Sequence, residues 1–162
     1  MALDFASNSS MLTVGSTPNI IQSAVGSLAV PQGVPAFAAW HTTTQAQNTV
    51  LVFNTALYNR GNFYNPATGI FTAQTKGIYH LKASVAVPLT AGDWRVYIPT
   101  TAGTTRQTIF YQNYTTSYQA LTVEAVLNMN VNDYAYVIYT GPTSINILNG
   151  TTINHFHGHM VV

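Results

Sequence analysis

Short β-type segments separated by turn residues limit most strongly how this chain can fold. From Ala36 onward, runs rich in Val, Ile, Thr, Tyr and Phe alternate with clusters of Gly, Pro and Asn. Such runs, recurring about every 8 to 14 residues, are typical of an antiparallel β-sandwich, and no long segment has helical periodicity. We expect strands over Ala36–Thr42, Thr49–Phe53, Gly69–Ala73, Gly77–Pro88, Arg95–Thr100, Gln107–Tyr114, Gln119–Met129, Tyr134–Tyr139 and His155–Val162.

Two of these segments indicate how the strands are buried. In Gln119–Met129 an apolar residue stands at every second position from Leu121, with mainly polar residues between, so we expect one buried face. The apolar stretch from Ile78 to Pro88 needs cover on both faces. We expect the second sheet of the sandwich on one side and a neighbouring subunit on the other.

The composition narrows the function classes. Charged residues make up only 6% of the 162 residues and the net charge is +1, against a usual charged fraction of about 25%. A surface so poor in charge suits a protein packed against partners, in an oligomer or on a larger particle. The basic residues are scattered, which argues against nucleic-acid binding and polybasic membrane attachment. The chain has no cysteine, which excludes disulfides and thiolate chemistry.

Residues 1–34 differ from the rest and are expected to form an extended N-terminal arm, before a single domain over residues 35–162. The arm is rich in Ser, Gly and Ala and is interrupted by Pro18 and Pro31. A flexible tail and an arm that docks on a subunit or a particle are both open readings, and spaced apolar residues favour docking. The candidate anchoring residues are Leu12, Val14, Ile20, Ile21, Val25 and Leu28.

Targeting signals are missing from the sequence as it stands. Met1-Ala2-Leu3-Asp4 has no basic region before an apolar stretch, so no secretory leader is predicted. No apolar run approaches the roughly 20 residues of a membrane span. We expect a protein made in the cytoplasm, without membrane insertion.

Residues 49–87 carry a pattern that resembles the signature of the C1q globular-head family. In that family a Phe is followed at fixed spacing by Asn, an aromatic residue, a second Phe and then Gly-x-Tyr. The matching positions are Phe53, Asn59, Tyr64, Phe71, Gly77 and Tyr79. Leu81 and Ala83 depart from the pattern, because the family usually has Phe and an aromatic residue there.

Three further segments agree with the resemblance, which extends over residues 35–162. Pro35–Ala39 is similar to the first strand of the family, Leu127–Val137 to its penultimate strand, and His155–Met160 to its closing Phe-x-Gly strand. The resemblance implies an all-β C1q/TNF-like jelly-roll sandwich of about ten strands, a homotrimer and no catalysis. We expect core or trimer-interface positions at Phe37, Phe53, Tyr64, Phe71, Tyr79, Phe156 and Met160.

His155, His157 and His159 are candidate metal ligands, because residues at every second position of a strand point to one face. Imidazole binds zinc, iron, nickel or copper. A trimer could bring three such sets to its threefold axis, as paired histidines do in bacteriophage fibre and spike proteins. In the alternative, the histidines face the sandwich or solvent, and Phe156, Gly158, Met160 and Val162 lie on the axis. The packing of the family favours this alternative, so no cofactor is assigned.

The remaining groups of polar residues give little indication of a catalytic or metal-binding site. The carboxylates Asp4, Asp93, Glu124 and Asp133 are few and scattered, which argues against a catalytic dyad, and a calcium site would need backbone carbonyls as further ligands. No nucleophile elbow or phosphate loop is present. Tyr114 and Tyr118 flank a polar stretch and are candidate surface-binding residues. In the plainer interpretation they belong to a solvated hairpin tip.

Together these features favour a non-enzymatic bacteriophage virion protein. We expect a trimeric capsid decoration, head-fibre or fibre-tip protein on the virion surface. Its arm would bind the major capsid protein or another virion protein, and its head would contact a host-surface glycan or protein. The alternative is an extracellular C1q-like recognition module whose leader has been removed.

Overall fold

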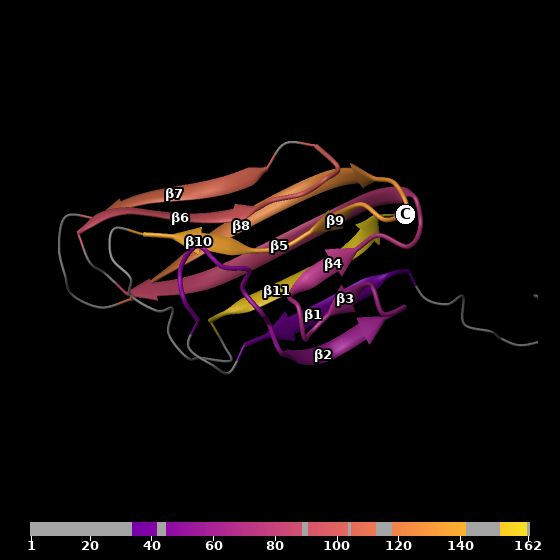
Figure 1. Ribbon diagram of the computed structural model, residues 1–162, viewed down its shortest axis with the longest axis horizontal. Helices are drawn as coiled ribbons and strands as arrows, with labels where there is room; N and C mark the ends of the chain where they lie inside the picture. The colour runs from indigo at the N-terminus through magenta and orange to yellow at the C-terminus, as the bar shows by residue number, and fades with distance from the viewer. Residues whose placement is uncertain are drawn as a thin grey trace, which may run out of the picture. The chain divides into compact units, whose positions relative to one another are not determined.

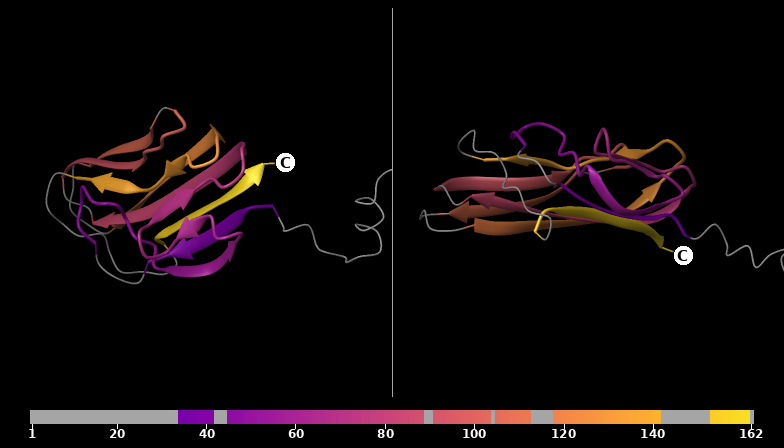
Figure 2. Two further views of the ribbon diagram at one scale, coloured as in Figure 1. Left: turned by 45° about the vertical axis from the view of Figure 1, so that its right-hand side comes forward. Right: turned by 90° about the horizontal axis from the view of Figure 1, so that it is seen from below.

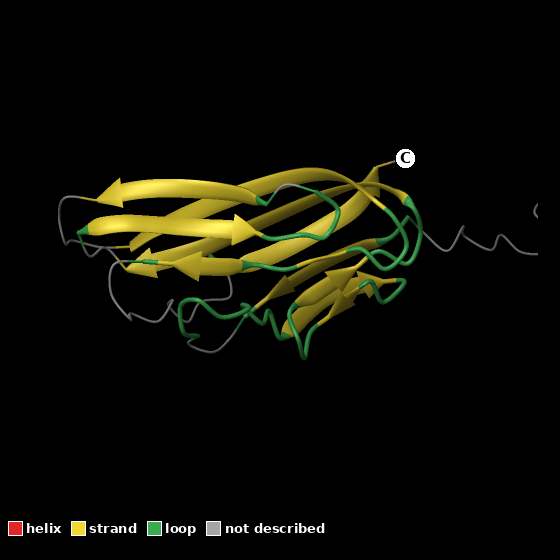
Figure 3. Cartoon of the chain, turned by 45° about the horizontal axis from the view of Figure 1, so that its top comes forward, coloured by secondary structure: helices red, strands yellow, loops and turns green. Residues whose placement is uncertain are grey.

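Two layers of antiparallel strands form the domain over Val34–Val162, which is one compact unit. The computed structural model describes residues 34–41, 45–88, 91–103, 105–112, 118–141 and 153–161. The two layers lie face to face (Figures 1 and 2), and Figure 3 shows only strands and loops in the described parts. Residues 1–33 of the expected arm lie outside the described ranges, and these include the anchoring candidates from Leu12 to Leu28.

The first layer is a five-stranded sheet in the order β2-β1-β11-β5-β8. Its strands are β1 (Ala36–Trp40), β2 (Thr55–Arg60), β5 (Gly77–Pro88), β8 (Tyr118–Met129) and β11 (His155–Val161). The pairing of β5 with β8 runs without a bulge from Gly77 opposite Met129 to Pro88 opposite Tyr118. This register places the apolar set that begins at Leu121 on the buried face, as the alternation predicts.

The second layer consists of two three-stranded sheets, with the orders β3-β4-β9 and β10-β6-β7. Its strands are β3 (Tyr64–Asn65), β4 (Ile70–Thr72), β6 (Gly92–Ile98), β7 (Arg106–Gln112), β9 (Tyr134–Ala135) and β10 (Ile138–Thr140). Only Tyr136 and Val137 separate β9 from β10, where the sequence predicts one strand. At this break the Tyr136 amide donates to Pro99, and the Val137 carbonyl accepts from Leu51. Counted as one interrupted strand, β9 and β10 bring the strands of the described residues to ten, in agreement with the expected jelly roll.

Aromatic rings fill the space between the layers at one end of the sandwich. The Phe37 ring stacks on Tyr64 with centroids 4.8 Å apart and meets Phe156 edge-on at 4.9 Å. Phe71 lies 5.4 Å from Phe37 and 5.3 Å from Tyr79. Because these rings come from β1, β3, β4, β5 and β11, one aromatic cluster ties both layers together.

One predicted strand is wrong and two strands were missed. Thr49–Phe53 is not a strand, although Leu51 donates one backbone hydrogen bond to Val137. Side chains satisfy much of its backbone: the Gln45 amide bonds both the N–H and the carbonyl of Val52, at 2.6 and 2.8 Å. The missed strands are β2, whose residues are largely exposed and show no apolar alternation, and β3, which has only two residues.

Candidate functional site

The signature positions of the sequence build the aromatic core. The Tyr64 hydroxyl accepts from the Phe53 amide at 3.0 Å and donates to the Phe53 carbonyl at 3.1 Å. The Asn59 side chain repeats this arrangement, since its amide group bonds the N–H and the carbonyl of Tyr64 at 3.2 and 2.6 Å. These side-chain hydrogen bonds link β2, β3 and the segment around Phe53, which do not pair with one another in a sheet.

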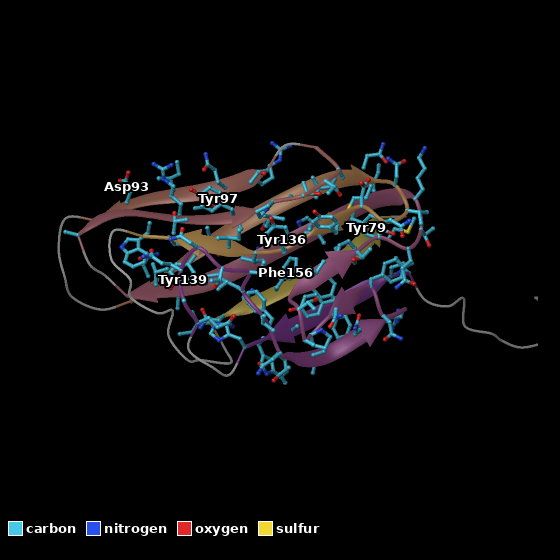
Figure 4. The ribbon with its side chains drawn as sticks, in the orientation of Figure 1. Tyr79, Asp93, Tyr97, Tyr136, Tyr139 and Phe156 are labelled. Carbon is cyan, nitrogen blue, oxygen red and sulfur yellow. The ribbon has the colours of Figure 1, made fainter. Side chains whose placement is uncertain are left out.

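Six of the seven residues predicted for the core or trimer interface are fully or almost fully buried within a single chain. These are Phe37, Phe53, Tyr64, Phe71, Tyr79 and Phe156, and Met160 is partly buried against them. The alternative that put Phe156 and Gly158 on a subunit axis is corrected, because their side of β11 faces the interior. Figure 4 labels Tyr79 and Phe156 within the body of the domain.

The histidines of β11 occupy the opposite side, on the outer face of the five-stranded sheet. In the register, His155, His157 and His159 lie opposite Ser84, Lys82 and His80 of β5. The rings of His155 and His157 are 5.3 Å apart and nearly parallel, at 18°. The rings of His80 and His159 are 5.4 Å apart across the two strands. The structure thus adds His80 to the three histidines predicted from sequence.

Partial burial keeps two of these imidazoles neutral. The pKa of His157 is lowered to about 4, mainly by loss of solvent, with contributions in the same direction from positive charge at His155 and Lys82. The pKa of His155 is also lowered, mainly by burial and then by Lys82. At neutral pH both rings are therefore uncharged and retain a nitrogen lone pair.

A charged group of three residues lies beside the histidines. The Lys82 ammonium is 2.6 Å from a carboxylate oxygen of Glu124, and His80 Nε2 is 3.7 Å from the other oxygen. The hydrogen bond and charge of Lys82 lower the pKa of Glu124, with a smaller contribution from His80. Glu124 is thus an anion on this face at neutral pH and offsets the charge of Lys82.

Exposed apolar side chains border the histidines on the same outer face. Val126 of β8 lies opposite His80 and is 62% exposed, and Ile78 of β5 is 47% exposed. Val161 at the end of β11 and Tyr58 of β2 are also exposed. We call this surface, formed by His80, His155, His157, His159, Lys82, Glu124, Ile78, Val126, Val161 and Tyr58, the histidine face. Its combination of apolar, neutral polar and paired charged groups is chemically suited to contact with protein.

A second candidate surface lies on the outer side of β6 and β10, which Figure 4 marks with Asp93, Tyr97 and Tyr136. Tyr97 lies opposite Ile138 in the register, and the Tyr134 and Tyr136 rings stack with centroids 6.2 Å apart. Arg95 lies 3.5 Å from Asp93. We call Arg95, Tyr97, Tyr134 and Tyr136 the tyrosine face. Sequence reasoning missed it because its residues come from separate strands.

The tyrosines proposed from sequence cannot be placed on either face. Tyr114 lies outside the described residues, and Tyr118 begins β8 with a side chain that is not described. Their role remains a prediction.

The described carboxylates have structural partners. Asp133 accepts from the Asn130 amide at 2.7 Å and from the Thr101 hydroxyl at 3.0 Å, which fixes a turn. Within the described ranges, no three His, Asp or Glu side chains gather closely enough to hold a metal ion. No helix suited to crossing a membrane occurs in those ranges either.

These features define a two-layered β-jelly roll of the recognition or structural type. The sequence model of the C1q domain matches residues 36–161, and the chain belongs to this family. The fold is similar to the globular domain of zebrafish complement 1qA, with a TM-score of 0.61 and 16% identity over 80% of this chain and 98% of that one. It is also similar to murine APRIL, with a TM-score of 0.66 and 11% identity over 80% of this chain and 100% of that one. A further similar fold is that of Eiger TNF from S. frugiperda, with a TM-score of 0.59 and 9% identity over 80% of this chain and 93% of that one.

Proposed function

We propose that this chain is a non-enzymatic head that forms a homotrimer through its histidine face. The observation that carries the proposal is the exposure of Val126 and Ile78 on the outer side of a sheet whose inner side is already packed. Burial of apolar surface contributes about 25 cal/mol per Å², so covering this face with neighbouring copies is favourable. C1q and TNF-type domains typically form homotrimers and bind ligands, which supports this assembly.

Light scattering on the purified protein tests the assembly. A mass three times that of the chain supports the proposal, and a monomer at the highest attainable concentration contradicts it. Amide hydrogen exchange adds a positional test, because β11 and β5 should be protected in the assembly beyond what their own sheet provides.

Within this class, the role we propose is a bacteriophage virion protein: a capsid decoration, head-fibre or fibre-tip trimer. The charge content of 6% suits a surface held permanently on a larger particle. Residues 1–34 would bind the major capsid protein or another virion protein. Deletion of residues 1–30 should leave a folded trimer that no longer binds its particle, whereas unfolding of the shortened chain would place these residues in the core.

The tyrosine face is the surface that we propose for ligand contact, with a host glycan or protein as the ligand class. Tyrosine supplies a large contact area at low entropy cost. Tyr134→Ala with Tyr136→Ala should abolish adsorption to host cells while the trimer mass stays unchanged. Adsorption at the wild-type level would move the contact to another surface.

The alternative is an extracellular recognition module that binds a glycan or a protein. The similarity to complement 1qA and APRIL domains favours it. Gold-labelled antibodies against the chain discriminate between the two roles: label on virus particles supports the virion role, and label confined to the cell-free medium supports the alternative.

A further inference from the structure

The histidine face concentrates imidazole on one small surface. His80, His155, His157 and His159 are four of the five histidines in the chain. Three of them stand at alternate positions of β11, and the fourth stands on β5, which is the neighbouring strand of the same sheet. Neutral imidazole is a common ligand for divalent transition metals in proteins.

The geometry offers two imidazole pairs. His155 and His157 form a pair along one strand at 5.3 Å, and His80 and His159 form a pair across two strands at 5.4 Å. A zinc–nitrogen bond is about 2.0 to 2.1 Å long, so two rings at these separations reach a shared ion with small rotations of their side chains. Each pair is therefore a bidentate half-site.

Neighbouring groups support such a use. Glu124 lies 3.7 Å from His80 Nε2, where a carboxylate can orient the ring and leave Nδ1 for an ion. Lys82 would repel a cation, but its ammonium is held by Glu124 at 2.6 Å.

One chain is not sufficient for a closed site. Among the described residues no three potential ligands gather around one point, whereas zinc sites usually need at least three protein ligands. We propose that the pairs His155–His157 and His80–His159 bind a divalent transition-metal ion, with the ligand set completed by a second copy of the chain. This inference rests on the proposed contact between copies through the histidine face.

Zinc titration of untagged, metal-stripped protein by calorimetry tests the inference. We expect saturable binding that is lost in His155→Gln/His157→Gln and in His80→Gln/His159→Gln. Asn128→Ala, on β8 of the same sheet, is the matched control and should bind zinc like the wild type. The optical spectrum of Co²⁺-loaded protein should show the intense bands of a tetrahedral site. Circular dichroism of each variant verifies that lost binding does not reflect lost folding.

Light scattering on the same samples separates this inference from the proposed assembly. A trimer that binds no zinc, or that binds equally well in both paired variants, would overturn the metal site and leave the assembly intact. A monomer would overturn the proposed assembly, and zinc binding by that monomer would overturn completion by a second copy. A trimer with saturable, histidine-dependent zinc binding supports both.

Discussion

The phenol of Tyr64 pairs with the backbone of Phe53 as a neighbouring strand would, because one hydroxyl serves both the N–H and the carbonyl of that residue. Both partners are buried, so water cannot replace the hydroxyl. This contact gives a physical reason for the fixed spacing of Phe53 and Tyr64 along the sequence in the family signature.

Tyr64→Phe keeps the ring but removes the hydroxyl, and leaves two buried backbone groups of Phe53 unsatisfied. We expect a loss of about 1–3 kcal/mol in the free energy of unfolding, measured with urea. Tyr134→Phe, at an exposed position of β9 away from the histidine face, is the control and should change stability by less than about 0.5 kcal/mol. Equal effects of the two changes would contradict the contact.

Phe156→Ala should act on folding rather than on assembly alone. Phe156 is fully buried against Phe37, Phe53 and Tyr64 of its own chain. Truncation of such a ring costs about 3–5 kcal/mol, so thermal unfolding should occur at a much lower temperature. Val131→Ala, at an exposed position, is the control and should leave the unfolding temperature nearly unchanged. A folded monomer of normal stability would instead place Phe156 at an interface.

The sequence predicted the long strands of the five-stranded sheet best. Gly77–Pro88 was predicted with its observed ends, and one end each of β8 and β11 differs from the prediction by one residue. Burial of the inner face fixes the alternation in these strands, including β8 at the edge of the sheet. Short strands such as β3 and β9 were merged or missed, because two residues show no periodicity.

The histidine face was only partly predictable for a related reason. Alternation on β11 groups His155, His157 and His159, but it does not decide whether they or Phe156 face inward. That choice follows from the aromatic cluster that Phe156 joins. His80 is 75 positions from His155 in the chain, and only the register of β5 against β11 places it beside His159.

Alkaline pH should destabilise the folded chain. Burial raises the pKa of both Tyr64 and Tyr79 above the ordinary value of 10.0, although backbone hydrogen bonding at Phe53 and Thr75 respectively lowers each pKa in part. Unfolded tyrosines ionise near pH 10 while the folded ones stay protonated. The contribution to stability is thus fully present below about pH 10 and is lost as the pH rises above it.

Urea unfolding of the wild type and of Tyr64→Phe between about pH 8 and pH 11 measures this effect. The decline should be smaller in the variant, which lacks one of the two buried phenols. An identical decline in both proteins would mean that the Tyr64 hydroxyl ionises normally in the folded state.

Light scattering on Val126→Asp tests the central claim most directly, because this substitution places a charge on the histidine face without touching the core. The account predicts a wild-type trimer and a Val126→Asp monomer whose circular dichroism is unchanged. Val131→Asp, at an exposed position in the turn after β8, should remain a trimer. A Val126→Asp protein that keeps the mass of the wild-type trimer would contradict assembly through this face.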